Sequence, residues 1–133
     1  PMLATNGGPV IAVALENEYG SFGNDLDYIR ELQKQYEKLG VDVLHPIQKH
    51  TMDWDKVAAD WKGRIAFWVG MDVQDTLING SPEDVRREVR LMRDTFDSPE
   101  GGFLYAAGNG IVGGTPIENI EAFLNEILTY RNN

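Results

Sequence analysis

Short, nearly continuous apolar runs alternate with longer stretches in which apolar residues recur every three or four positions. The short runs predict β-strands, and strands without polar alternation are typical of a parallel sheet that is buried on both faces. These runs are residues 10–16, 41–46, 65–71 and 102–107. Because an amphipathic stretch follows each of them, the pattern predicts an α/β fold made of four βα units.

The amphipathic stretches predict helices. The first has its apolar positions between Leu26 and Leu39, and the second is short, between Trp54 and Trp61. Aromatic residues at helix and strand spacing, including Trp68, are expected in the core, and the alternative is that they line a flat hydrophobic pocket for a macrocycle.

The next two helices carry start signals. The third begins at Ser81, a capping hydroxyl followed by a proline, which the first helical turn tolerates. The fourth begins in the same way at Thr115, and Glu118 completes a capping-box pattern.

The repeat poses a packing problem, because consecutive right-handed crossovers place their helices on one side of the sheet. An uncovered face with about eight large apolar side chains forgoes on the order of 10 kcal/mol. We therefore expect a single domain over residues 1–133, a TIM-barrel-like half barrel with a parallel sheet. It would form a homodimer that completes the barrel. A doubly wound sheet and a piece of a larger barrel are the alternatives.

Composition narrows the function classes. Hydrophobic residues make up 42% of the chain and charged residues 25%, as in globular proteins, and no apolar run approaches the roughly 20 residues that span a membrane. The net charge of −9 disfavours nucleic-acid binding, which needs clustered cations. The lack of cysteine excludes disulfides and thiolate zinc sites. It also fits a cytoplasmic location, and we expect no signal peptide because residues 1–6 are too short for one.

Residues 7–20 read GGPVIAVALENEYG, and the stretch SFGNDLDYIRELQKQYEKLGVDV continues to about Val43. This motif resembles the signature of family 35 glycoside hydrolases, the β-galactosidase family, which are (βα)8 barrels. The resemblance implies that Glu18 is the general acid/base and that Asn17 contacts the sugar 2-hydroxyl. Ala14 stands where the signature usually has glutamine, and no segment matches the family's nucleophile.

Glu16 precedes Glu18 by two positions on the same predicted strand, so both side chains point to one side, about 7 Å apart. At that separation the two carboxyls could act as an inverting acid and base. The alternative is that both are solvated at a strand end. If the two carboxyls act together, Glu16 lies beside the sugar, and it is a candidate substrate-binding residue for that reason.

The segments VDVLHPIQ, FWVGMDVQDTLINGSPEDVRREV and GGFLYAAGNGIVGGTPIENIEAF lie within about residues 40–130. They resemble the C-terminal half of the uroporphyrinogen decarboxylase superfamily, whose members are also (βα)8 barrels. Asp72 matches that superfamily's strand-end aspartate, whereas Asn109 replaces the usual histidine in a glycine turn. The two resemblances together indicate a chimera of barrel fragments, natural or engineered.

Candidate site residues follow the strands at their carboxyl ends. Asp72 is a candidate catalytic residue, with hydrogen bonding to loop amides as its alternative role. His45, Gln74 and Asn109 are candidates for substrate binding. We expect no metal site, because His45 and His50 match no ligand spacing, and no cofactor. The glycine-rich residues 108–114 could hold a small anionic ligand.

These observations favour a chimeric barrel fragment without a complete active site. Three alternatives stay open. They are a decarboxylase-like lyase acting on a tetrapyrrole or polycarboxylate, a β-galactosidase-like glycosidase using Glu18, and a binding module for an anion.

Overall fold

A computed structural model describes residues 31, 34–35, 38 and 42–130. The chain divides into two compact units, Pro1–Gln35 and Tyr36–Asn133. In the first unit, Glu31 and Gln35 are helical, as the sequence predicts for this stretch, and the Gln35 amide donates to the Glu31 carboxylate at 2.8 Å. The predicted strand at residues 10–16 lies outside the described residues, and the single domain stays a prediction.

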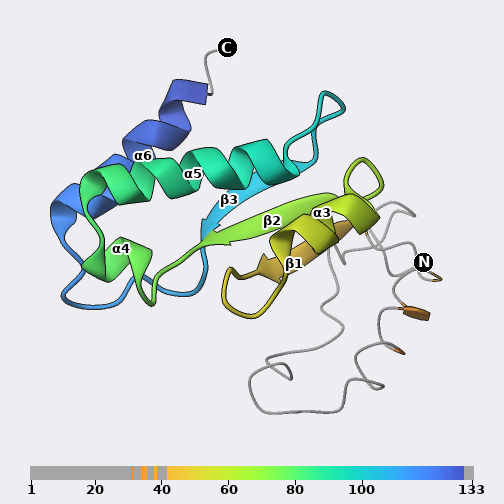
Figure 1. Ribbon diagram of the computed structural model, residues 1–133, viewed down its shortest axis with the longest axis horizontal. Helices are drawn as coiled ribbons and strands as arrows, with labels where there is room; N and C mark the ends of the chain where they lie inside the picture. Colours follow the sequence, from red (N-terminus) through yellow and green to blue (C-terminus); the bar gives the residue numbers. More distant parts are fainter. Residues whose placement is uncertain (1–30, 32–33, 36–37, 39–41, 131–133) are drawn as a thin grey trace, which may run out of the picture. The chain divides into compact units, whose positions relative to one another are not determined.

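The second unit alternates strands and helices (Figure 1). Its elements are β1 (Val43–Ile47), α3 (Trp54–Trp61), β2 (Ala66–Met71), α4 (Thr76–Asn79), α5 (Pro82–Phe96), β3 (Phe103–Ala107) and α6 (Ile117–Tyr130). The three strands form a parallel sheet in the order β1-β2-β3. The predicted α/β class is therefore confirmed, and the arrangement is consistent with part of a TIM-barrel-like half barrel.

The start of α5 follows its sequence signal, whereas the start of α6 does not. The Ser81 hydroxyl accepts a hydrogen bond from the Asp84 amide at 3.3 Å, and the Asp84 carboxylate accepts one from the Ser81 amide at 2.9 Å. At α6 the expected capping box is replaced by another contact. The Thr115 hydroxyl donates to the Val112 carbonyl at 2.9 Å, so it stabilises the preceding loop.

The core lies between one face of the sheet and the helices. From β2, the side chains of Phe67, Val69 and Met71 are at most 1% exposed. The α5 residues that share this core are Val85, Val89, Met92 and Phe96, with 0–1% exposure, and α3 and α6 add Trp54, Ala58, Ala122 and Phe123. Burying a large apolar side chain contributes roughly 1.5–3 kcal/mol, so this layer is the main stabilising contact of the unit.

The opposite face of the sheet lacks such cover among the described residues. Trp68 is paired in register with Leu104 on β3, and the two side chains are 42% and 48% exposed. Val43 on β1 is 44% exposed. The expectation that Trp68 is a core residue is wrong for this unit, because its position on β2 faces away from the helices.

We predict that Gly70→Ala destabilises the protein by about 1–3 kcal/mol, because overpacking forces a backbone shift. A Cβ atom on Gly70 would lie 2.3 Å from the Cα of Gly108. Thermal unfolding followed by circular dichroism measures the change. Gly110→Ala is the matched control, since its Cβ would meet nothing within 4 Å. Equal melting temperatures for the two variants would contradict the close approach of the two glycines.

Candidate functional site

The loops after the three parallel strands meet at one edge of the sheet, where α/β proteins commonly bind ligands. Gln48 follows β1, Asp72 follows β2 and Asn109 follows β3. The structure thus brings the loops of two predicted site residues, Asp72 and Asn109, to one end of the sheet, together with Gln48. Glu16, Asn17 and Glu18 lie outside the described residues, so their predicted roles are untested by the structure.

Asp72 is the centre of a hydrogen-bond network. Its side chain is 3% exposed, and one carboxylate oxygen, Oδ2, accepts a hydrogen bond from the His50 ring nitrogen Nε2 at 2.8 Å. The other oxygen, Oδ1, accepts from the backbone amides of Gln74 and Asp75 at 2.9 and 3.2 Å. These contacts give Asp72 the loop-stabilising role that the sequence offered as an alternative, and contact with a ligand stays a prediction.

The short helix α4 also depends on Asp72, and the sequence did not predict this helix. The Leu77 amide donates to the Asp72 carbonyl at 2.8 Å, and the Thr76 amide lies 3.4 Å from the Asp72 carboxylate. Side chains of this kind commonly cap turns and helix starts. The aspartate that follows β2 was the feature of the sequence that could have indicated this helix.

Glu88 is a second buried carboxylate, which the sequence analysis missed. Its side chain is 3% exposed and extends from α5 to the loops after β1 and β2. It accepts hydrogen bonds from the Asp72 amide at 2.9 Å, from the Thr76 hydroxyl at 2.7 Å and from the Lys49 ammonium at 2.5 Å. Its position in the sequence could have revealed its burial. Glu88 lies three residues after Val85 and four before Met92, on the buried side of α5.

The two carboxylates are thus surrounded by donors. Burial is the largest single influence on Asp72 and raises its pKa. The hydrogen bonds from the His50 ring and from the amides of Gln74, Thr76 and Asp75 together outweigh burial, so the pKa lies below the usual value. An ionised Asp72 is therefore the stable form near neutral pH, and it holds the loop rather than a proton.

The two histidines lie in different places. The His45 ring stacks on Trp68, with 4.4 Å between ring centroids, and its Nδ1 lies 3.3 Å from the Trp68 carbonyl oxygen. His50 instead contacts Asp72. Within residues 42–130 no group of three or more side chains is arranged to hold a metal ion.

Gln48 and the other predicted site residues make local contacts. The Gln48 side-chain amide donates to the Gly108 carbonyl at 3.0 Å, which joins the loops after β1 and β3. The Asn109 carbonyl oxygen accepts from the Gly110 amide at 2.9 Å. Both Gln74 and Asn109 are exposed. Binding of a substrate or small anion by these residues stays a prediction.

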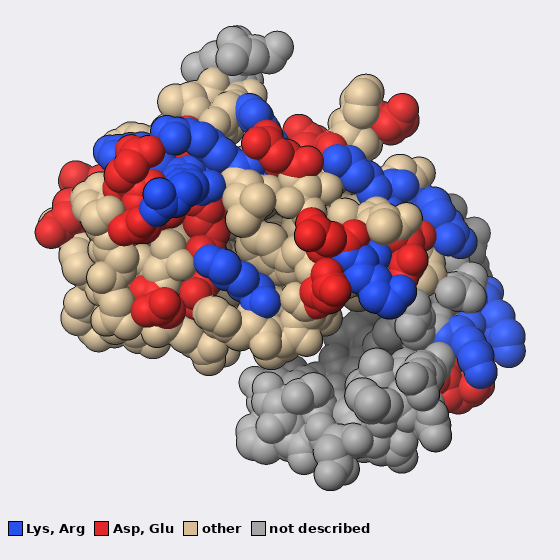
Figure 2. Space-filling model, in the orientation of Figure 1, with Lys and Arg blue, Asp and Glu red and all other residues tan. Residues whose placement is uncertain are grey.

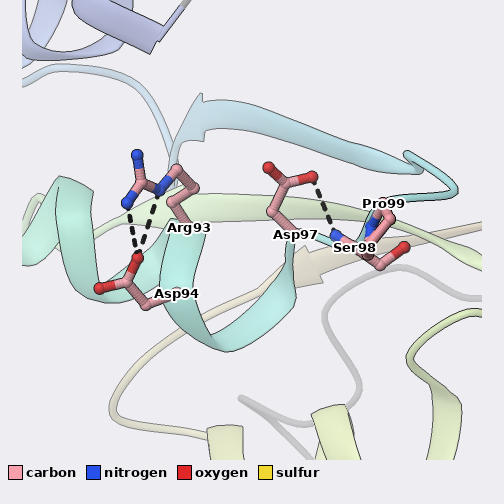
Figure 3. Close-up of a pocket in the computed structure, with 5 residues that line it drawn as sticks. All are labelled: Arg93, Asp94, Asp97, Ser98 and Pro99. Atoms are coloured by element: carbon pink, nitrogen blue, oxygen red, sulfur yellow. Dashed lines mark hydrogen bonds and ion pairs between the residues drawn. The ribbon is translucent and has the colours of Figure 1, made fainter. Parts of the chain in front are cut away.

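Two surface hollows flank α5. One, of about 430 Å³, adjoins the polar network and is lined by Lys49, Thr76, Arg87 and Glu88 among others. The other, of about 300 Å³, lies after the end of α5 (Figure 3). There, Arg93 pairs with Asp94 at 2.8 Å and Asp97 accepts from the Ser98 amide at 3.0 Å, so these polar groups are already engaged.

The helices of the described residues include none with the length and apolar character needed to cross a bilayer. The cytoplasmic location stays a prediction.

Comparison with known proteins identifies one family. The sequence pattern described as Glycosyl hydrolases family 35 matches residues 1–90, which is more than half of the 133-residue chain. The match continues past Val43 into a stretch that we related to the decarboxylase superfamily. The comparisons give no support to that second resemblance.

Individual relatives match over a shorter stretch. The chain is 59% identical over 46 residues to a beta-galactosidase of Homo sapiens, which covers 33% of this chain and 7% of that protein. It is 53% identical over 45 residues to beta-galactosidase 17 of Arabidopsis thaliana, covering 33% of this chain and 6% of that protein. For a beta-galactosidase of Xanthomonas manihotis the identity is 50% over 42 residues, covering 32% and 7%. The matches therefore span only a small part of each relative.

We predict that Asp72→Ala lowers the free energy of unfolding by about 1–3 kcal/mol, because the His50 ring and the loop amides lose their shared buried acceptor. Urea unfolding measures the loss. Asp75→Ala removes an exposed carboxylate from the same loop and is expected to change stability by no more than about 0.5 kcal/mol. If both variants lost the same amount, the network around Asp72 would not be a stabilising contact.

The same carboxylate gives a pH dependence. Because folding lowers the Asp72 pKa below its ordinary value of 3.8, the stability from its ionised form is complete above pH 3.8 and is lost as pH falls through the lower folded-state pKa. Asp72→Asn cannot titrate at this position. We expect the stability difference between the wild type and this variant to shrink below pH 3.8. A constant difference in urea unfolding across that range would contradict the assignment.

Proposed function

Because the chain belongs to the glycosyl hydrolases of family 35, we propose that it takes part in the hydrolysis of β-galactosides, with Glu18 as the general acid/base. Asn17 would contact the sugar beside it. The observation that carries this proposal is the family match over residues 1–90, and the 59% identity to a human beta-galactosidase supports it.

The chemistry needs two carboxyl groups. In a retaining glycosidase, a protonated carboxyl donates to the leaving oxygen while a carboxylate about 5–5.5 Å away attacks the anomeric carbon. The acid must keep its proton near neutral pH, which desolvation at a strand end favours. Glu18 fills the first role in this proposal.

Two buried carboxylates of the described residues are unsuited to act as the nucleophile. The buried carboxylates Asp72 and Glu88 each accept at least three hydrogen bonds from this unit's own groups. Each carboxylate thus uses about three of its roughly four lone-pair sites within this unit, which leaves it less free to attack a substrate. We therefore propose that the nucleophile lies in sequence beyond this chain, since the matched segment is only 6–7% of each relative.

The proposal predicts the behaviour of a graft. When residues 7–43 of this chain replace the corresponding residues of the human enzyme, we expect the hybrid to hydrolyse a chromogenic β-galactoside. Introducing Glu18→Gln into the hybrid should lower kcat by at least about a hundredfold, the usual contribution of general acid/base catalysis.

Glu31→Gln in the same hybrid is the control, because Glu31 lies within residues 7–43 and on the exposed side of a helix. We expect that variant to keep the activity of the hybrid. A folded hybrid without activity, or one whose activity survives Glu18→Gln, would overturn the proposal.

A second candidate function comes from the segment after residue 90, which lies beyond the family match. This segment contains the end of α5 together with β3 and α6, and its residues 101–123 carry the second resemblance. We propose as the alternative that the chain is a chimera whose second part acts on a tetrapyrrole or a related polycarboxylate. Incubation of the full chain with uroporphyrinogen tests this, and a carboxylate count equal to that of the protein-free control would remove it.

A further inference from the structure

The chain contains three Asn-Gly dipeptides, which begin at Asn6, Asn79 and Asn109. This dipeptide is chemically labile, because glycine has no side chain to hinder attack by its own amide nitrogen on the asparagine before it. Asn6 lies outside the described residues, whereas Asn79 and Asn109 are both described and both exposed. Since these two dipeptides have the same residue types and similar exposure, the local structure around each one decides how fast it reacts.

The reaction requires the glycine nitrogen to reach the side-chain carbon Cγ of asparagine. The nitrogen loses its proton to solvent and bonds to Cγ, the bond from Cγ to Nδ2 breaks, and Nδ2 leaves as ammonia. Water then opens the resulting imide ring. If the bond from the glycine nitrogen to Cγ breaks, the product is aspartate, and if the bond to the main-chain carbonyl carbon breaks, it is isoaspartate. Intramolecular attack of this kind is fast only when the two atoms can approach to about 3–3.5 Å in the right alignment.

Asn109 is in a conformation that permits this approach. It follows the end of β3 in an irregular stretch, and residues 109–114 are all exposed. The Gly110 amide nitrogen lies 2.9 Å from the Asn109 side-chain oxygen, which is bonded to Cγ. Rotation about the bond between Cβ and Cγ turns that carbon toward the nitrogen, and this torsion is soft in asparagine. A Cβ atom on Gly110 would meet nothing within 4 Å, so the ring has space to form.

Asn79 is held by the end of a helix. It is the last residue of α4, and its side-chain amide donates to the Asp75 carboxylate at 3.2 Å. The Gly80 nitrogen donates to the Thr76 carbonyl at 3.0 Å, and the Gly80 carbonyl accepts from the Asn119 side-chain amide at 2.8 Å. Attack by the Gly80 nitrogen therefore requires this helix end to open, and local opening has a cost in free energy. The loop after β3 needs no such opening.

We propose that Asn109 is a modification site, at which spontaneous deamidation converts the amide into aspartate and isoaspartate, and that the fold protects Asn79 from the same reaction. Water is the co-reactant and ammonia is the product that leaves. The proposal goes beyond the proposed function and does not depend on it.

The new carboxylate enters a part of the chain without charged residues. Residues 101–117 contain no Asp, Glu, Lys or Arg, whereas charged side chains of both signs lie together on the face shown in Figure 2. Modification adds one negative charge to a chain whose net charge is −9, in the loop where we expected a small anion to bind. The modified chain should therefore repel anions from this edge of the sheet more strongly than the unmodified chain.

Incubation of the full 133-residue chain at mildly alkaline pH tests the proposal, followed by digestion and peptide mapping with mass spectrometry. Fragmentation assigns each new acid to its residue, and isoaspartate peptides elute separately. In the folded chain we expect Asn109 to react at least about tenfold faster than Asn79, because only Asn79 waits for a helix end to open. In guanidinium chloride that unfolds the chain, the two rates should differ by less than about threefold, because these surroundings are lost.

Gly110→Ala is the matched variant. Its Cβ lies in open space, so the melting temperature should stay that of the wild type, while the added methyl group hinders attack on Asn109 and slows its modification. Absence of modification at Asn109, or an equal rate at Asn79 in the folded chain, would overturn the proposal. So would a rate ratio that unfolding leaves unchanged, because neighbouring residues rather than the fold would then set it. A Gly110→Ala chain that is modified at the wild-type rate would also contradict the mechanism.

Discussion

The packing of β2 under α5 is the contact on which the described unit depends. Phe67, Val69 and Met71 alternate along the strand toward the helix, whose matching side chains are almost fully buried. The same face of α5 carries Glu88 to the Asp72 loop. Because one helix face supplies both the apolar layer and the buried carboxylate, the geometry of the polar network follows from the packing of the core.

The same packing leaves the two faces of the sheet unequally buried. The helices of the described residues contribute to one core, and the strand positions that alternate with it, such as Trp68 and Leu104, stay half exposed. A strand of continuous apolar residues is stable only when both faces leave water. Within residues 42–130, the sheet is thus covered by helices on one face and partly exposed on the other.

The family match to glycosidases includes β1 and β2 of the described unit, whereas the proposed catalytic residue does not belong to that unit. Family membership rests on residues 1–90, and the proposed acid/base Glu18 lies outside the described residues. The network of Asp72, Glu88 and their donors lies at the edge of the sheet where ligands often bind. Its hydrogen bonds are used within the protein, however, and they indicate a structural role in fixing the loops around a site.

The sequence by itself determined the order of the three strands and of helices α3, α5 and α6 after residue 40, because apolar periodicity and the Ser81 cap are local signals. It also placed Asp72 at a strand end and offered its amide-binding role. Only the tertiary structure decided that Glu88 turns inward, that His50 rather than His45 meets Asp72, and that Trp68 faces away from the core. Those outcomes depend on which segments distant in sequence lie side by side, and local periodicity carries no information about that choice.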